Sequence, residues 1–169
     1  MSCLLLAWVI GGCAQIDDTG MESDDGIDVL INELMADNES TVANEDGEYD
    51  DWIELYNPSD NPVSLIGLYI TDDLANPKAF TFSDVSIPAQ GFVLIWADKK
   101  TSLGSHHLPF SLDKDGEEIG LSYEDEAGNV VIMDALTFGV QEPDISYGRS
   151  PDGGTWQSLD TPSPGTNNP

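Results

Sequence analysis

The sequence predicts an all-β protein, an antiparallel sandwich or barrel, and three observations support this fold class. Short runs of apolar residues recur along most of the chain, separated by Gly, Pro, Asn and Asp. No stretch has the 3.6-residue periodicity of a helix long enough to compete. The hydrophobic share of 40% in 169 residues is enough to build one core.

The first three strands are predicted over residues 28–35, 51–57 and 62–71. The first, DVLINELM, carries apolar residues on both faces, and so does the second, DWIELYN. Asn57-Pro58 ends the second strand, because Pro cannot donate a ladder hydrogen bond. In the third, PVSLIGLYIT, apolar residues alternate, and Gly67 marks a bulge or a close approach of two backbones.

The middle of the domain contains a short predicted strand over 78–82 and a longer one over 92–97. A turn at 87–91, IPAQG, separates them, and the longer run, FVLIWA, is apolar throughout, as in a buried strand. Residues 107–112 are predicted to be the next strand, because apolar residues occupy every second position.

The last four predicted strands are 117–123, 130–138, 145–149 and 156–159. The loop 124–129 makes a hairpin of the first two, because it is rich in turn residues. A tail of Pro, Gly and Asn follows the last strand. We therefore expect about ten short strands at regular spacing.

The first 27 residues predict a leader and a tether. Residues 4–12 are an apolar run of the length of a signal-peptide core, too short to cross a bilayer. The run ends Ile10-Gly11-Gly12-Cys13, which resembles a bacterial lipobox and makes Cys13 the predicted site of lipid attachment. Secretory cleavage after Ala14 is the alternative. We expect a leader over 1–13 and a disordered acidic linker over 14–27.

This leader predicts an exported protein, anchored by lipid at the outer membrane or cell surface, or otherwise secreted or periplasmic. Both cysteines, Cys3 and Cys13, lie in the leader. The domain that follows therefore has neither a disulfide framework nor a cysteine metal site.

The net charge of −27, from 32 acidic and 5 basic residues, restricts the partners of this protein. Such a surface is repelled by nucleic-acid phosphates and by anionic lipid headgroups. Cations and basic protein surfaces are the partners that it attracts, and a lipid anchor is the predicted contact with the membrane.

No enzyme signature occurs in the sequence. There is no G-x-S-x-G and no H-E-x-x-H, and no Cys/His pair lies after the leader. Adjacent residues on a strand point to opposite faces, so His106 and His107 cannot chelate one ion together, and we expect both at the surface near a loop. We predict a protein without catalytic residues.

Two acidic loops could hold calcium, which takes six to eight oxygen ligands. The alternative is a solvated acidic surface, and no other cofactor is predicted. The candidate ligands are Asp46, Glu48, Asp50 and Asp51 in the first loop and Asp72 and Asp73 in the second.

Two charged residues and one tryptophan are further candidates. Glu54 lies between aromatic residues, and Arg149 is the only arginine. We predict a structural ion pair between them, or a Glu54 carboxylate bound to backbone donors at a strand end. Trp52, Trp96 and Trp156 could form a carbohydrate-stacking face. Core packing is the better interpretation for Trp96, which lies in a continuous apolar strand, and Trp156, near the end of the chain, is the tryptophan to test for ligand contact.

Seven segments in order resemble the lamin tail domain family. They are Ile31-Asn32-Glu33-Leu34-Met35, Asp51-Trp52-Ile53-Glu54-Leu55-Tyr56-Asn57, Leu65-Ile66-Gly67-Leu68-Tyr69-Ile70-Thr71-Asp72-Asp73, Phe92-Val93-Leu94-Ile95-Trp96-Ala97-Asp98, Pro109-Phe110-Ser111-Leu112 with Asp115-Gly116-Glu117, Ser146-Tyr147-Gly148-Arg149-Ser150-Pro151-Asp152-Gly153, and Trp156 with the ending Thr161–Asn167. The resemblance implies an immunoglobulin-like antiparallel β-sandwich over residues 28–167, of the bacterial exported type. Such domains are non-catalytic and often accompany nucleases, phosphoesterases or surface proteins.

The resemblance and the charge together predict an interaction or scaffolding module at the bacterial cell envelope. Its partner would be a protein or a surface polymer. Two alternatives stay open at this point: a calcium-dependent adhesion or carbohydrate-binding module, and an accessory component of an envelope hydrolase or nuclease.

Overall fold

The computed structural model describes residues 28–169, in which short strands follow one another with one three-residue 3₁₀ helix, η1 (Thr101–Leu103). The strands in chain order are β1 (Leu30–Met35), β2 (Asp51–Tyr56), β3 (Val63–Ser64), β4 (Tyr69–Thr71), β5 (Phe80–Thr81), β6 (Ser86–Ile87), β7 (Phe92–Ala97), β8 (Glu117–Glu124), β9 (Val130–Phe138), β10 (Ser146–Ser150) and β11 (Thr155–Leu159).

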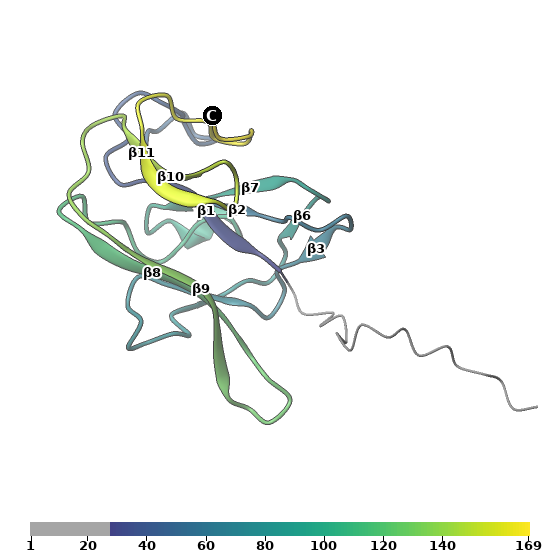
Figure 1. Cartoon of the computed structure of the whole chain (residues 1–169). Coiled ribbons are helices and arrows are strands. Elements are labelled where there is room, and N and C mark those ends of the chain that lie inside the picture. The colour runs from purple at the N-terminus through teal and green to yellow at the C-terminus, as the bar shows by residue number, and fades with distance from the viewer. Residues whose placement is uncertain (1–27) are drawn as a thin grey trace, which may run out of the picture.

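Two antiparallel sheets face each other and form an immunoglobulin-like β-sandwich, as predicted (Figure 1). One sheet has the strand order β11-β10-β1-β2-β7, and the other has the order β5-β4-β8-β9. Strands β3 and β6 form a separate two-stranded ribbon. The long strand β9 is therefore at the edge of its sheet, and β10 lies beside β1, far from it in sequence.

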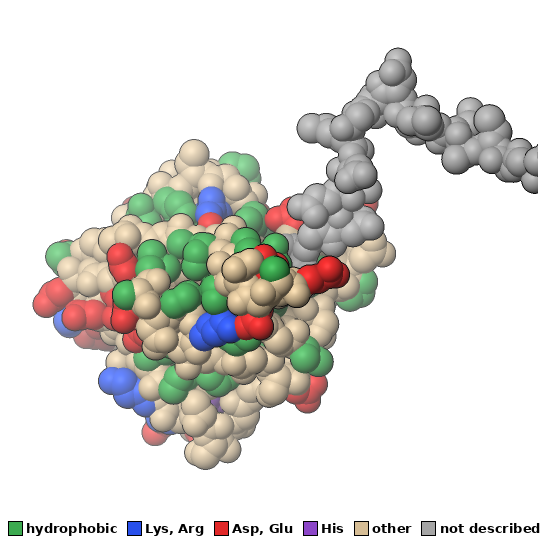
Figure 2. Space-filling model, turned by 90° about the horizontal axis from the view of Figure 1, so that it is seen from below, with side chains coloured by type: hydrophobic (Ala, Val, Ile, Leu, Met, Phe, Trp, Pro, Cys, Tyr) green, Lys and Arg blue, Asp and Glu red, His purple; other side chains and the backbone are tan. Residues whose placement is uncertain are grey.

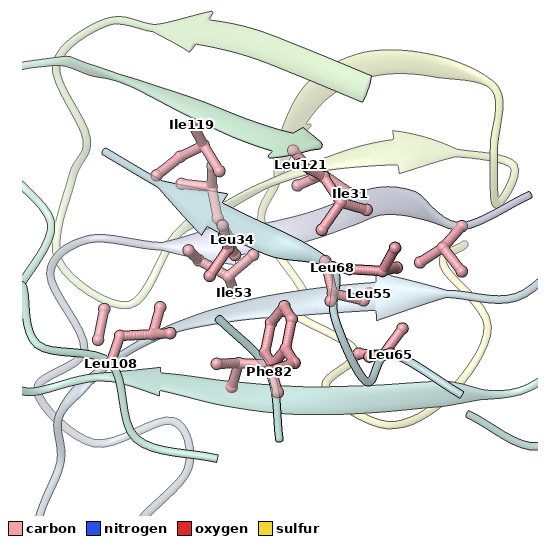
Figure 3. Close-up of a cluster of buried hydrophobic side chains, with 14 of the residues drawn as sticks. Ile31, Leu34, Ile53, Leu55, Leu65, Leu68, Phe82, Leu108, Ile119 and Leu121 are labelled. Atoms are coloured by element: carbon pink, nitrogen blue, oxygen red, sulfur yellow. The ribbon is translucent and has the colours of Figure 1, made fainter. Parts of the chain in front are cut away.

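The core lies between the two sheets, where side chains from both inner faces meet (Figure 3). Ile53 and Leu55 of β2 point inward beside Ile31 of β1, and Ile119 and Leu121 of β8 approach them from the opposite sheet. All five side chains are fully buried. Each contributes about 1.5–3 kcal/mol relative to an exposed position.

The predicted strand over 62–71 is divided into two strands by a turn. Gly67 adopts a φ of +85°, which residues with a Cβ rarely tolerate, and the Leu68 N–H donates to the Leu65 carbonyl at 2.9 Å. β3 then pairs with β6, whereas β4 pairs with β8 in the sandwich. The alternation of apolar residues continues through this turn, and so it could not reveal the break.

The predicted strand over 107–112 is wrong. This segment makes only isolated bridges, a parallel one from His107 to Trp96 and an antiparallel one from Ser111 to Asp98. Pro109, in its middle, has no N–H to donate to a ladder. Alternate residues are nevertheless buried, as the pattern suggested: Leu108, Phe110 and Leu112.

Among residues 28–169, no helix has the length and apolar composition needed to cross a membrane. The predicted leader, the linker and Cys13 lie outside the described residues.

Candidate functional site

Glu54 is the most unusual charged residue of the described chain, because it is completely buried on the outer side of β2. Its neighbours Ile53 and Leu55 fill the core, so alternation along the strand directs Glu54 to the opposite face. Its carboxylate accepts hydrogen bonds from the Asn32 side chain at 3.1 Å and from the Gly165 N–H at 2.6 Å. Donors of the chain itself therefore bind the carboxylate.

Burial raises the pKa of Glu54 to about 8. The two hydrogen bonds lower this pKa, and the nearby carboxylates of Glu33 and Asp152 raise it further, but the loss of water around the carboxylate is the largest cause. Glu54 therefore binds a proton more readily in the folded protein than in the unfolded chain.

Glu33 of β1 lies beside Glu54 in the strand register and is also fully buried. It accepts hydrogen bonds from the Ser146 hydroxyl and from the N–H and hydroxyl of Ser163. Burial raises the pKa of this carboxyl as well. Opposite Glu33 on β10 stands Gly148, where a Cβ would lie 2.6 Å from Leu159 and 3.1 Å from Glu33. Because Gly148 has no side chain, the Glu33 side chain fits against β10.

Residues 160–169, here called the C-terminal segment, cover an acidic cluster, which we define as the buried Glu33 and Glu54 together with the half-buried Asp152. Besides the donors from Ser163 and Gly165, the Asn168 N–H donates to Asp152 at 3.0 Å. The Asn168 side chain also donates to the Arg149 carbonyl at 2.7 Å. A buried carboxylate without such donors would be costly, so the cluster and the segment depend on each other.

The predicted ion pair between Glu54 and Arg149 is wrong, because these side chains lie on opposite faces of the sheet. Gly148 faces Glu33 on the outer side, so Arg149, the next residue, points inward. Its guanidinium contacts both carboxylate oxygens of Asp134 on β9, at 2.9 and 3.0 Å. For Glu54, the alternative interpretation, a carboxylate bound to a backbone donor, matches the Gly165 contact.

Arg149 connects the two sheets. Besides Asp134, it donates to the carbonyls of Ile31 at 2.9 Å and Gly154 at 3.0 Å. The guanidinium lies over the ring of Trp156, which also stacks on Tyr147 with ring centres 5.2 Å apart. Trp156 was the residue predicted for ligand contact, but both contacts pair its ring with side chains of the protein itself.

His107 is fully buried, so the prediction that it lies at the surface is wrong for this residue, although His106 is exposed. Its two ring nitrogens lie 2.7 Å from Asp98 and 2.7 Å from Glu45. Burial alone lowers the pKa of His107, but the bonds to both carboxylates outweigh burial and raise it. A charged imidazole donates through both nitrogens, which links the loop after β1 to the end of β7.

Two of the candidate acids of the first loop, Glu48 and Asp50, are paired within the fold. Lys100 donates to Glu48 and, at 2.7 Å, to Asp50. Asp51 is half-buried, and burial raises its pKa to about 6, which weakens it as a cation ligand. The Asp46 N–H is bound by Asn44.

Neither predicted calcium loop forms a metal cage in the described residues. In the second loop, Asp73 accepts a hydrogen bond from the Ala75 N–H at 2.9 Å, while Asp72 is half-exposed beside it. Within residues 28–169 there is no group of three His, Cys, Asp or Glu side chains placed to hold a metal ion.

A second, smaller apolar cluster lies on the outer face of the five-stranded sheet. Trp52 and Trp96 are buried there against Met35, as expected for Trp96, with Val42 of the loop after β1 packed on them. The indole N–H of Trp52 is buried and has no hydrogen-bond partner in the part of the chain that the structure describes. These rings are closed off from a carbohydrate surface.

The exposed apolar side chains are found elsewhere, and half of them lie on or just after β9. Figure 2 shows a face on which hydrophobic side chains gather centrally with acidic side chains around them. The large apolar residues with the greatest exposure are Tyr49, Ile66, Leu103, Val130, Ile132 and Val140.

The sequence pointed to some of these groups and missed others. Glu54 and Arg149 stand out because a charged residue among apolar neighbours in a strand needs a partner. Glu33, in Ile31-Asn32-Glu33-Leu34, carries the same signal and could have been identified. Asp134 and Asp152 could not, because only the packing of β9 and the β10–β11 turn against β1 makes them partners.

Chemically, the buried carboxylates and the buried histidine bind donors and acceptors of the chain itself. Comparison with known proteins gives one match: the family model described as Lamin Tail Domain covers residues 22–139. Neither the curated proteins nor the solved structures contain a match. The matched region ends before β10, although β10 is paired with β1 in the same sheet.

Proposed function

The chain belongs to the lamin tail domain family, a family of non-enzymatic immunoglobulin-like interaction domains, and from this we propose a non-catalytic binding module at the bacterial cell envelope. Its partner is a protein or a surface polymer, bound through strand edges and loops of the rigid sandwich. One observation carries the proposal: the buried carboxylates and the buried histidine described above are bound by donors and acceptors of the chain itself. Recognition is thereby left to the surface.

The surface charge decides which partners are favoured. With 32 acidic residues against 5 basic ones, the protein attracts basic surfaces and repels nucleic acid and other polyanions. Complementary charge mainly accelerates association and selects the partner, while apolar contacts at the centre of an interface supply affinity. A basic protein surface with apolar residues suits both requirements.

The test is to identify the partner and reconstitute the complex. Photo-crosslinking of the protein in its native host, followed by purification of both components, is expected to give a saturable complex with a basic protein or polymer. Turnover of a substrate by the purified protein would contradict the proposal. The absence of any saturable complex among reconstituted components would do the same.

Display at the envelope rests on the sequence Ile10-Gly11-Gly12-Cys13. The proposal places a lipid on the Cys13 thiol, with residues 14–27 as the tether. Replacing Cys13 by serine should move the protein from the membrane fraction to the soluble fraction. Mass spectrometry should find an acylated N-terminal peptide in the unmodified sequence alone. An identical distribution of both proteins between fractions would exclude the anchor.

A further inference from the structure

The free edge of β9 is the strongest unassigned surface of this protein. In the described residues β9 pairs with β8 alone, and the ladder is interrupted once, at Met133. In an antiparallel pair, alternate residues direct both N–H and C=O away from the partner strand. No backbone group of β9 has a hydrogen-bond partner beyond β8 within residues 28–169. At Asp134 the strand contacts the other sheet, because this side chain accepts hydrogen bonds from the Ile31 N–H and from Arg149. The unpaired backbone groups open to another chain are therefore those before Asp134, from Val130 to Met133.

Apolar side chains accompany this edge. Val130 is 37% exposed and Ile132 is 46% exposed, and because they alternate along the strand they share one face. Val140, which follows the strand, is 69% exposed. The β8–β9 hairpin extends past the rest of the body, so another chain could approach it (Figure 1).

The other sheet edges are less suitable. β5 has two residues, and the C-terminal part of β7 is already covered, because Trp96 exchanges backbone hydrogen bonds with His106 and Leu108. The edge strand β11 holds Trp156, whose ring is engaged by Tyr147 and Arg149. Only β9 combines unpaired backbone groups, exposed apolar side chains and a hairpin that extends past the body of the described domain.

The acidic residues at both ends of β9 indicate what kind of segment can pair with it. Glu124 ends β8 and is paired with Lys78, the turn before β9 carries Asp125 and Glu126, and Glu142 follows β9. If two copies of β9 paired in either direction, acids would face acids at the ends of the strands. A segment with basic residues at its ends avoids this repulsion.

We propose that β9 accepts an extended, basic segment of a partner protein as an additional strand, with apolar side chains of that segment packed on Val130 and Ile132. This inference rests on the proposed function and names the surface and the partner class. Backbone hydrogen bonds would provide the pairing, and the acidic ends of β9 would select lysine or arginine.

The probe for the test is a labelled peptide as long as β9, with alternating valine and threonine between terminal lysines. Anisotropy titration of the full-length protein should give saturable binding, and hydrogen exchange should show new protection along β9. A peptide of equal charge, N-methylated at every second residue, should bind about tenfold more weakly or worse, because it lacks the donors for pairing. Equal affinity for both peptides would overturn strand addition.

Two protein variants locate the surface. Ile132→Lys places a like charge against the peptide at an exposed position and should weaken binding about tenfold. The matched control is Ile66→Lys, at a 64% exposed residue of the turn between β3 and β4, which should leave affinity unchanged. Equal effects of the two variants would overturn the assignment to β9, as would dimerisation through β9 in sedimentation.

This failure is distinguishable from failure of the proposed function. If the crosslinked partner binds Ile132→Lys as tightly as the unmodified protein, the edge of β9 is not the site, yet the protein still functions as a binding module.

Discussion

Arg149 is the residue that joins the two sheets of the sandwich at the β9 side. Its Nη2 donates to both carboxylate oxygens of Asp134, and its Nε and Nη1 donate to the carbonyls of Ile31 and Gly154. The side chains of Arg149 and Asp134 are 16% and 11% exposed. A planar fork of donors matches this set, and lysine could not reproduce it. Arg149 therefore stabilises the sandwich through the arrangement of its donors as well as through its charge.

Replacing Arg149 by alanine should destabilise the protein by about 3–5 kcal/mol, because Asp134 would be left partly buried without a counter-charge. Chemical denaturation measures the change. Lys78→Ala, which breaks an exposed pair with Glu124, is the control and should cost less than about 1 kcal/mol. Equal small effects of both substitutions would show that Arg149 does not join the sheets energetically.

We expect Glu54 to make stability depend on pH. Its pKa is raised from 4.5 to about 8 on folding, so the folded state binds more protons than the unfolded state between these values. The contribution of Glu54 is fully present below pH 4.5 and is lost as pH rises through about 8.

Glu54→Gln, which keeps a neutral side chain at every pH, should reduce the fall in melting temperature across this range. The exposed Glu126→Gln serves as the control and should preserve the fall. If Glu54→Gln and the unmodified protein lose stability in parallel between pH 4.5 and 8, burial of this carboxylate has no energetic consequence.

At the scale of elements, the C-terminal segment completes the sandwich rather than trailing from it. The family match ends at residue 139, yet β10 and β11 extend the sheet beyond β1, and residues 160–169 cover the acidic cluster. The segment contains no strand, and its attachment consists of hydrogen bonds to side chains and carbonyls.

Ending the chain after Leu159 should lower stability by about 2–4 kcal/mol, because three or more hydrogen bonds to buried groups are lost. Thermal unfolding of the truncated and full chains measures this loss. Thr166→Ala, at an exposed residue of the segment, should have almost no effect. A truncated protein that melts at the same temperature would show that the segment is not needed to shield the carboxylates.

At the scale of the whole molecule, the sequence predicted what alternation encodes and missed what packing decides. Strands such as β2, β7 and β9 follow from local patterns, because one face of each must be buried. The break at Gly67 and the irregular segment after η1 did not follow, since buried irregular chain has the same apolar pattern as a strand.

Contacts between residues that are distant along the chain also could not be predicted from the sequence. Arg149 contacts Asp134 because the chain crosses from one sheet to the other between β9 and β10, and no local pattern encodes that crossing. The same holds for the loop acids, whose partner Lys100 follows β7. The fold was therefore easier to predict than the pairing of its charges.

We propose that the excess of acidic residues is the property of the whole molecule that selects its partner. The measurement that tests this most directly is the affinity of the reconstituted complex as a function of salt concentration. We predict a saturable complex whose dissociation constant rises steadily with salt, because screening weakens attraction between opposite charges. An affinity that does not change with salt, or that increases with it, would contradict a module that binds through its acidic surface.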